Sequence, residues 1–177
     1  MGSEYPVRVQ SMTTTNTNDT EACVKQAEDI IKAGGELVRL TTQGTREAEN
    51  LKPINAQLRA DGYTTPLVAD VHFNPNVADV AALYAEKVRI NPGNYVDPAR
   101  KFIKQEYTDE EYAAELKKIE ERLIPFLNIC KANHTAVRIG VNHGSLSDRI
   151  RNRYGDTPEG IVESCMEFLR IFKREKF

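Results

Sequence analysis

The sequence predicts an α/β protein built on a parallel sheet. Five short apolar runs alternate along the 177 residues with stretches of helical periodicity. Strands that alternate with helices in this way form parallel sheets with right-handed crossovers. Two architectures fit: the N-terminal five strand–helix units of a (β/α)8 TIM-type barrel, or an open parallel α/β sheet. The first run is not followed by Gly-x-Gly-x-x-Gly, which disfavours a dinucleotide-binding sheet.

The apolar runs are expected to be strands because they are short and rich in valine, isoleucine and leucine. In chain order they occupy residues 7–12, 37–41, 66–73, 87–91 and 136–142. A polar loop of threonine and asparagine follows the first run, and a Pro-Gly-Asn turn interrupts the chain after the fourth. The strands therefore have clear ends, and polar residues gather there.

Helical periodicity occupies the intervals between the runs. The expected helices cover residues 19–33, 45–61 and 75–84, and a last one opens at Thr157. A Gly-Gly pair ends the first helix, and Pro53 is expected to kink or split the second. Pro75 suits the first turn of the third helix. Ser145 is a candidate cap for a short helix after the fifth strand.

The connection between the fourth and fifth strands, about residues 95–135, is long and carries an amphipathic helix. Its apolar residues advance by alternating steps of four and three: Tyr112, Leu116, Ile119, Leu123, Phe126 and Cys130. Thr108 and Glu111 form a capping-box pattern at its start, and Pro125 predicts a kink. We expect this apolar stripe to pack inside the domain. A surface for a partner protein is the alternative.

Composition and charge restrict the class of protein. The chain is 40% hydrophobic and 28% charged, which suits one globular domain or a piece of a larger one. A formal charge of −2 gives no drive toward nucleic acid or anionic membranes. No apolar run reaches the roughly 18 residues of a spanning helix, and the first residues do not resemble a signal peptide. A cytoplasmic protein without nucleic-acid or membrane partners is expected.

The cysteines do not suggest a metal centre. Cys23, Cys130 and Cys165 lie far apart in the sequence, without a C-x-x-C spacing. Each falls in a helical pattern beside apolar residues, as a small buried side chain would. We therefore expect reduced thiols and no metal bound by this chain.

Three of the expected strands place an arginine between two aliphatic residues. These arginines are Arg39, Arg89 and Arg138. A buried guanidinium without a partner costs several kcal/mol, so each needs an anion at its tip. Asp70 could satisfy one of them in a structural salt bridge, but three arginines leave a positive surplus. Because the guanidinium fork matches phosphate oxygens, the sequence predicts a pocket for a phosphate or diphosphate.

Further polar residues share strand faces with one another, since side chains two apart on a strand point to the same side. Asp70 and His72 form such a pair, and Asn91 and Asn142 each share a face with the arginine of their own strand. All lie near the carboxyl ends of the strands, where ligands bind in both architectures. His72 is expected to contact the ligand or transfer a proton, and a packed or surface histidine is the alternative.

Four segments carry a resemblance to a known family. They are VQSMT at 9–13, LVADVHF at 67–73, VRINPGN at 88–94 and VRIGVN at 137–142. Their identity and order resemble the 4-hydroxy-3-methylbut-2-enyl diphosphate synthases, and the resemblance runs from about residue 7 to the end. It implies an N-terminal barrel similar to the pterin-binding barrel of dihydropteroate synthase. In the full-length enzyme a 4Fe–4S domain would follow that barrel.

The resemblance also implies a reaction. The family reductively opens 2-C-methyl-D-erythritol 2,4-cyclodiphosphate to hydroxymethylbutenyl diphosphate in non-mevalonate isoprenoid biosynthesis. Electrons come from ferredoxin or flavodoxin through the 4Fe–4S cluster, and the enzymes form homo-oligomers. By this resemblance the cyclic diphosphate is clamped and oriented by residues of this chain: Arg39, Arg89 and Arg138 on the diphosphate, with Asp70, His72, Asn91 and Asn142 on the ring oxygens and hydroxyls.

The chain departs from the family pattern in several places. Its cysteines do not have the spacing of the family's cluster ligands, so the C-terminal iron–sulfur domain is expected to be absent from residues 1–177. Only five strand–helix units are present, and the long connection resembles the form with inserted sequence. His143 stands where a small residue is expected. This chain alone is therefore expected to be inactive. The alternatives are a pterin-binding barrel and a non-catalytic association module.

Overall fold

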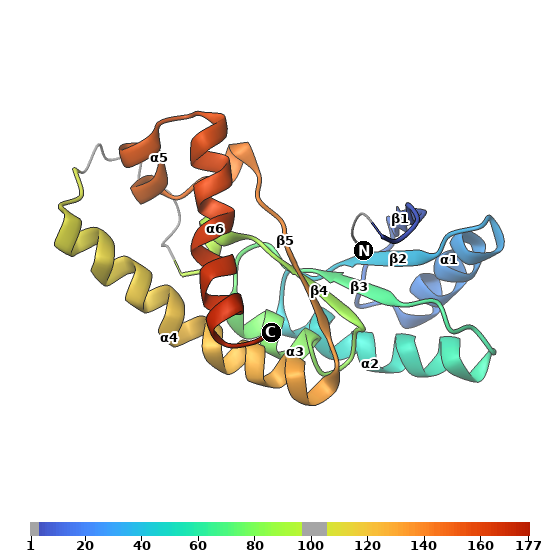
Figure 1. Cartoon of the computed structure of the whole chain (residues 1–177). Helices are drawn as coiled ribbons and strands as arrows, with labels where there is room; N and C mark the ends of the chain where they lie inside the picture. The colour runs from blue at the N-terminus through green and yellow to red at the C-terminus, as the bar shows by residue number, and fades with distance from the viewer. Residues whose placement is uncertain (1–3, 97–105) are drawn as a thin grey trace.

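The computed structural model describes residues 4–96 and 106–177, in which five strands form one parallel sheet. The strands are β1 (Gln10–Met12), β2 (Leu37–Thr41), β3 (Leu67–Asp70), β4 (Lys87–Ile90) and β5 (Ala136–Ile139). Their order across the sheet is the order of the chain (Figure 1). A doubly wound sheet reverses its strand order once, whereas successive strands of a barrel are neighbours. The prediction of a partial barrel is therefore confirmed over the open sheet.

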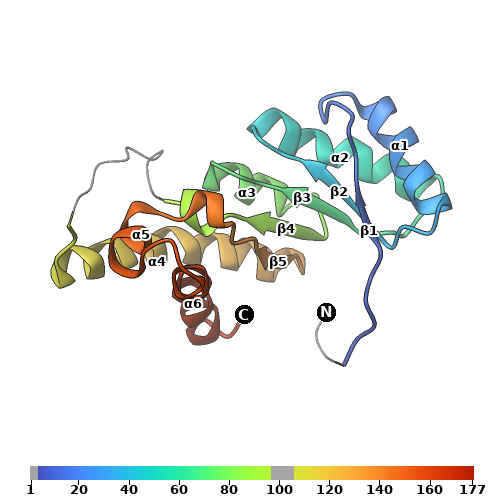
Figure 2. The same cartoon turned by 90° about the horizontal axis from the view of Figure 1, so that it is seen from above.

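The helices are α1 (Thr20–Lys32), α2 (Thr45–Ala60), α3 (Pro75–Ala81), α4 (Asp109–Asn133), α5 (Asp148–Tyr154) and α6 (Pro158–Arg174), with the short 3-10 helices η1 (Pro92–Asn94) and η2 (His143–Ser145). Figure 1 shows α2 and α3 along one side of the sheet, below it in that view. Figure 2 shows the molecule from above, the side that faces away from α2 and α3 in Figure 1, with α6 near β5. Among the described residues, the helices therefore pack on one face of the sheet and leave the other face uncovered.

The apolar core lies between the sheet and the helices. Alternate residues of β2, β3 and β4 are almost fully buried there: Val38, Leu40, Leu67, Ala69, Val88 and Ile90. Helices α1 to α4 supply the opposing side chains, among them Ala27, Leu51, Ile54, Leu58, Val77, Ile119, Leu123 and Phe126. Burial of one large aliphatic or aromatic side chain stabilises the fold by about 1.5–3 kcal/mol. Because side chains alternate along a strand, the remaining residues point to the other face.

Three strands are at least three residues shorter than the sequence predicts. β1 begins at Gln10 rather than residue 7, β3 ends at Asp70 rather than 73, and β5 ends at Ile139 rather than 142. Val7 is 94% exposed, since in the described residues β1 has a paired strand on one side only. The prediction that His72 shares a strand with Asp70 is wrong, because His72 lies in the loop beyond the strand end.

Helix ends follow the local sequence closely, with two corrections. The capping box is confirmed: Thr108 Oγ1 accepts a hydrogen bond from the N–H of Glu111 at 3.2 Å, and Glu111 Oε2 accepts one from the N–H of Thr108 at 2.8 Å. Ser147, rather than Ser145, caps α5. Pro53 does not split its helix, which continues unbroken from Thr45 to Ala60. Pro53 removes only one helical hydrogen bond, and tertiary packing holds the remainder of the helix together.

The amphipathic helix of the long connection, α4, packs inside the domain, as expected. Most of its apolar stripe is buried, including Ile119 and Phe126. A buried carboxylate, Glu167 of α6, joins the three C-terminal helices. It accepts hydrogen bonds from Arg149 Nη2 of α5 at 2.6 Å and from the hydroxyl of Tyr112 of α4. The stripe is therefore a structural interior, and the partner-surface alternative loses its main support.

Candidate functional site

The pairing register places the three predicted arginines on one face of the sheet. Residues paired across parallel strands point to the same side, and Arg89 is paired with both Asp70 and Arg138. Thr41 is paired with Asp70, which puts Arg39, two residues earlier on β2, on that side as well. This face, opposite the helices, is called the polar face below.

Asp70 is the centre of the polar face. Its side chain is 2% exposed; Oδ2 accepts a hydrogen bond from Arg39 Nη2 at 2.5 Å, and Oδ1 accepts one from Arg89 Nη1 at 3.2 Å. His72 Nε2 lies 2.9 Å from Oδ2. Burial alone would raise the pKa of the Asp70 carboxyl, but hydrogen bonds from Arg39 and His72 outweigh it and lower this pKa. An ionised Asp70 therefore holds three other predicted site residues together.

Arg89 reaches across to the end of β5. Its Nη2 donates a hydrogen bond to the carbonyl oxygen of Gly140 at 2.7 Å. A Cβ atom at position 140 would lie 1.8 Å from Arg89 Nε, so a glycine is required for this close approach. Burial lowers the pKa of Arg89, and the charge of Asp70 opposes that effect. Sequence reasoning missed this contact, because the strand pattern alone places Gly140 beside Arg138.

The cations of the polar face offer more hydrogen-bond donors than the face has acceptors. Arg39 Nε is buried without a hydrogen-bond acceptor. Arg138 is exposed, and within the described part of the chain it forms no hydrogen bond or ion pair. Lys87, which the sequence reasoning also missed, is 8% exposed; burial lowers its pKa and repulsion from Arg138 adds to this. With Arg89, the face carries four cations against one carboxylate, which favours an anionic ligand.

Two touching turns meet beside the polar face, at the carboxyl ends of β4 and β5. Asn91 Nδ2 donates a hydrogen bond to Ser145 Oγ at 2.9 Å, and Asn142 Oδ1 accepts one from the N–H of Gly144 at 2.9 Å. A Cβ atom on Gly93 would lie 1.5 Å from the carbonyl oxygen of Ser145, so the two backbones are in direct contact. The predicted asparagines therefore also shape the turns that present them.

A hollow of about 450 Å³ opens above these turns. It is lined by His72, Phe73, Asn91, Asn94, Asn142, Gly144 and Ser145. Three of the predicted residues thus line the hollow, while the arginines and Asp70 lie on the polar face, linked to it through His72. The volume falls in the range of small-molecule sites. The structure therefore joins an amide-rich hollow to a cationic sheet face.

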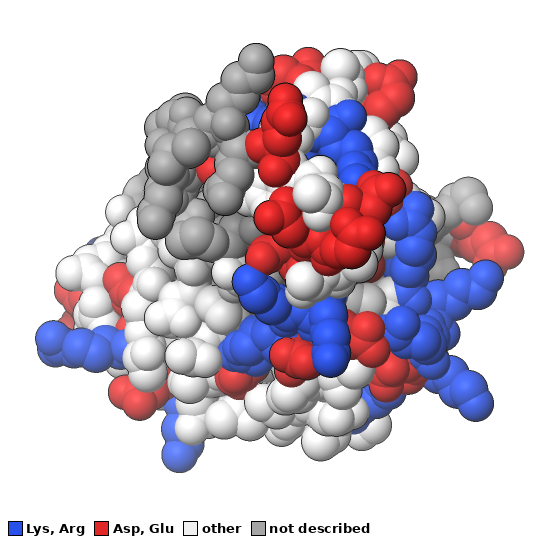
Figure 3. All heavy atoms as spheres, turned by 90° about the vertical axis from the view of Figure 1, so that its left-hand side faces the viewer, with Lys and Arg blue, Asp and Glu red and all other residues white. Residues whose placement is uncertain are grey.

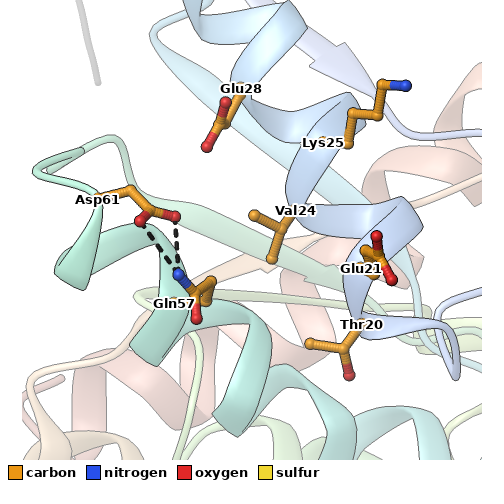
Figure 4. Close-up of a pocket in the computed structure, with 7 residues that line it drawn as sticks. All are labelled: Thr20, Glu21, Val24, Lys25, Glu28, Gln57 and Asp61. Carbon is orange, nitrogen blue, oxygen red and sulfur yellow. Dashed lines mark hydrogen bonds between the residues drawn. The ribbon is translucent and has the colours of Figure 1, made fainter.

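A second hollow, of about 410 Å³, lies between α1 and α2 on the helical side of the domain (Figure 4). It is lined by Thr20, Glu21, Val24, Lys25, Glu28, Gln57 and Asp61. Three carboxylates against one lysine make this groove unfavourable for an anion. It shares no residue with the polar face, so the polar face and its hollow remain the candidate site.

Other features give no second candidate. In residues 4–96 and 106–177, no group of three or more His, Cys, Asp or Glu side chains could hold a metal ion. Cys23 and Cys130 are buried and Cys165 is half-buried, on three different helices. Figure 3 shows acidic and basic side chains interspersed over one face of the molecule. No helix in the described residues is long and apolar enough to cross a membrane.

Comparison with known proteins gives a consistent result. A family model described as the GcpE TIM-barrel domain matches residues 1–177. Relatives named 4-hydroxy-3-methylbut-2-en-1-yl diphosphate synthase (flavodoxin) are 76% identical in Phocaeicola vulgatus, 67% in Parabacteroides distasonis and 49% in Chlorobaculum tepidum. Each match covers 100% of this chain, but only 29%, 29% and 24% of the respective relative. The chain spans less than a third of the length of these curated relatives.

Proposed function

The chain belongs to the GcpE TIM-barrel domain family, and from that premise we propose that it is the substrate-binding part of a 4-hydroxy-3-methylbut-2-en-1-yl diphosphate synthase. The proposed substrate is 2-C-methyl-D-erythritol 2,4-cyclodiphosphate, which the complete enzyme opens reductively in non-mevalonate isoprenoid biosynthesis. The observation that carries this proposal is the polar face, where three arginines are offset by one carboxylate.

The arginines would hold the diphosphate. No group in the described part of the chain accepts a hydrogen bond from Arg138, and Arg39 Nε has no acceptor. Arg89 is already paired with Asp70 and Gly140, so it would bind a phosphate oxygen by adding a contact or exchanging one. Charge-assisted hydrogen bonds of this kind are about twice as strong as neutral ones. The cost of burying the unpaired cations would thereby be offset in the complex.

The hollow would hold the remainder of the substrate. His72, Asn91 and Asn142 line it and carry donors and acceptors suited to ring oxygens and hydroxyls. Asp70, which is buried and fully engaged, would support the substrate indirectly by fixing Arg39, Arg89 and His72. A hollow of about 450 Å³ with these polar groups has room for a small polyol phosphate.

The redox part of the reaction would reside outside this chain. The described residues do not fit a 4Fe–4S cluster, because their cysteines are buried or half-buried on separate helices. We propose that the cluster belongs to a further domain of the longer enzyme. The printed names of the relatives favour flavodoxin over ferredoxin as the electron donor. A cytoplasmic homo-oligomer remains part of the proposal.

Isothermal titration calorimetry of this chain with the cyclic diphosphate tests the proposal. Saturable binding is expected, and each of Arg39→Ala, Arg89→Ala and Arg138→Ala should weaken it at least about tenfold, or about 1.4 kcal/mol. Lys25→Ala, in the groove between α1 and α2, is the matched control and should bind like wild type. Equal affinity in all four variants would overturn the assignment of the polar face as an anion site.

A further inference from the structure

The imidazole of His72 lies between a carboxylate and a guanidinium. Its Nε2 is 2.9 Å from Asp70 Oδ2, and Arg89 Nη1 is 3.0 Å from its Nδ1 and 3.2 Å from its Nε2. Since Nη1 is almost equally far from both ring nitrogens, the guanidinium faces the ring rather than one lone pair. Nε2 thus has an acceptor in Asp70, whereas Nδ1 faces only a cation.

The charged groups around this ring come from four strands. Asp70 of β3 lies 2.9 Å from Nε2 of the ring, and Arg89 Nη1 of β4 lies 3.0 Å from its Nδ1. Arg39 of β2 pairs with the same carboxylate oxygen as His72 and so weakens its attraction. Arg138 of β5 is paired with Arg89 and adds positive potential. Without a ligand, the charges near the ring are therefore one carboxylate and three guanidinium groups.

We propose that binding of a diphosphate at the arginines loads His72 with a proton. This rests on the proposed function, because it takes the anion site as given. Phosphate oxygens compete with Asp70 for the guanidinium donors of Arg39 and Arg89. The Asp70 carboxylate then becomes less compensated, and the anion itself brings negative charge near the ring. Both changes favour the imidazolium form. One proton is taken from solvent at Nδ1, while Nε2 keeps its hydrogen bond to Asp70.

The coupling gives His72 a defined place in the proposed reaction. Reductive removal of a substrate oxygen as water consumes protons, and His72 lines the hollow next to the diphosphate site. A proton taken up only when the anion is bound would be available at the right moment and absent from the empty site. His72 is thereby a proton carrier whose state depends on Arg89 and Asp70, rather than a fixed hydrogen-bond donor.

Proton NMR can follow this directly, because the chain has only three histidines. The imidazole Cε1–H resonances are recorded from about pH 5 to about pH 9, with inorganic pyrophosphate or with sodium chloride at equal ionic strength. His72→Asn assigns the His72 signal. His134 is the internal control, since it caps the end of α4 at the opposite edge of the sheet, before β5 begins. Calorimetry on the same samples measures pyrophosphate binding independently.

The expected result is an upward shift of the His72 protonation midpoint by about one pH unit with pyrophosphate. Sodium chloride should produce no such shift, and His134 should be unaffected by either salt. In Asp70→Asn the shift should be smaller, because there is no carboxylate beside the ring from which pyrophosphate could draw the arginine donors away. If pyrophosphate binds by calorimetry but the His72 midpoint stays in place, this inference is overturned and the anion site stands. If pyrophosphate does not bind at all, the anion site and the inference fall together.

Discussion

Replacing Gly140 by alanine tests whether the end of β5 holds Arg89 in place. A Cβ atom there would lie 1.8 Å from Nε and 2.7 Å from Cζ of Arg89, so the guanidinium must move. It would lose its hydrogen bonds to Gly140 O, at 2.7 Å, and to Asp70 Oδ1, at 3.2 Å. Hydrogen bonds to charged groups contribute about 1.5–3 kcal/mol each. The free energy of unfolding should therefore fall by about 3–6 kcal/mol, or by about half of that if Arg89 recovers one bond.

Denaturant titration at a fixed chain concentration measures this change, and calorimetry measures pyrophosphate affinity, which should fall at least about tenfold. Gly144→Ala is the matched control, because its Cβ would meet only Asn142 Oδ1 at 3.4 Å, an ordinary contact. The free energy of unfolding of that variant should stay within about 0.5 kcal/mol of the wild-type value. In an Arg89→Ala background, Gly140→Ala should lower the free energy of unfolding little further, since the Arg89 side-chain atoms that the new Cβ would meet are absent. The reasoning is refuted if the two glycine variants unfold alike, or if the cost persists in the Arg89→Ala background.

Three further predictions concern the charges and edges of the sheet. In a full-length enzyme that carries this segment, Arg138→Ala should lower kcat/KM at least about tenfold, and Arg138→Lys should recover only part, since an ammonium lacks the bidentate fork; wild-type kinetics in Arg138→Ala would contradict the anion site. Because the pKa of Asp70 is lowered from its ordinary 3.8, its carboxylate should stabilise the fold above that pH and lose this contribution as the pH falls through the lowered value. Denaturant titrations of wild type and Asp70→Asn should then converge in acid, and a constant difference at every pH would exclude this linkage. Finally, β1 and β5 are the edges of the described sheet, so light scattering at micromolar concentration should report a dimer or larger species; a monodisperse monomer would argue against pairing at the edges.

Local pattern was enough to predict the units of the fold, because each depends on short-range physics. Apolar runs marked all five strands, and the steps of three and four marked the amphipathic helix that became α4. The ends of strands were less predictable. β1 is short because pairing, rather than residue type, decides where a strand stops, and its paired register with β2 begins at Gln10. Likewise, Pro53 breaks no helix, because neighbouring turns are held by core contacts of Leu51 and Ile54.

The candidate site, like the fold, could be predicted from the sequence only in part. Alternation along each strand was sufficient to set Arg39, Asp70 and Arg89 apart from the aliphatic side chains beside them, since that requires only the two-residue period. The register between strands was needed for the rest. It decides that the guanidinium of Arg89 crosses Gly140, a contact between residues 51 positions apart. Lys87 joins the polar face because it lies two residues before Arg89 on β4, although nothing in its local sequence distinguishes it from a lysine at a strand end.

The distribution of unpaired charge on the polar face bears on what completes it. A face built only for structural ion pairs would balance its charges, yet Asp70 is the one carboxylate that the five strands direct there. Arg138, whose donors are free, is level with Arg89 and Asp70 near the carboxyl ends of the strands, after which Asn91 and Asn142 line the hollow, whereas Arg39 is level with Val68 and its free Nε is buried. Lys87 stands two residues nearer the amino end of β4 and does not line that hollow. Because a buried ammonium also requires compensation, the two ends of the face need different partners. A ligand fits the arginines, whereas Lys87 lines a separate hollow that also contains Glu36 and Glu86.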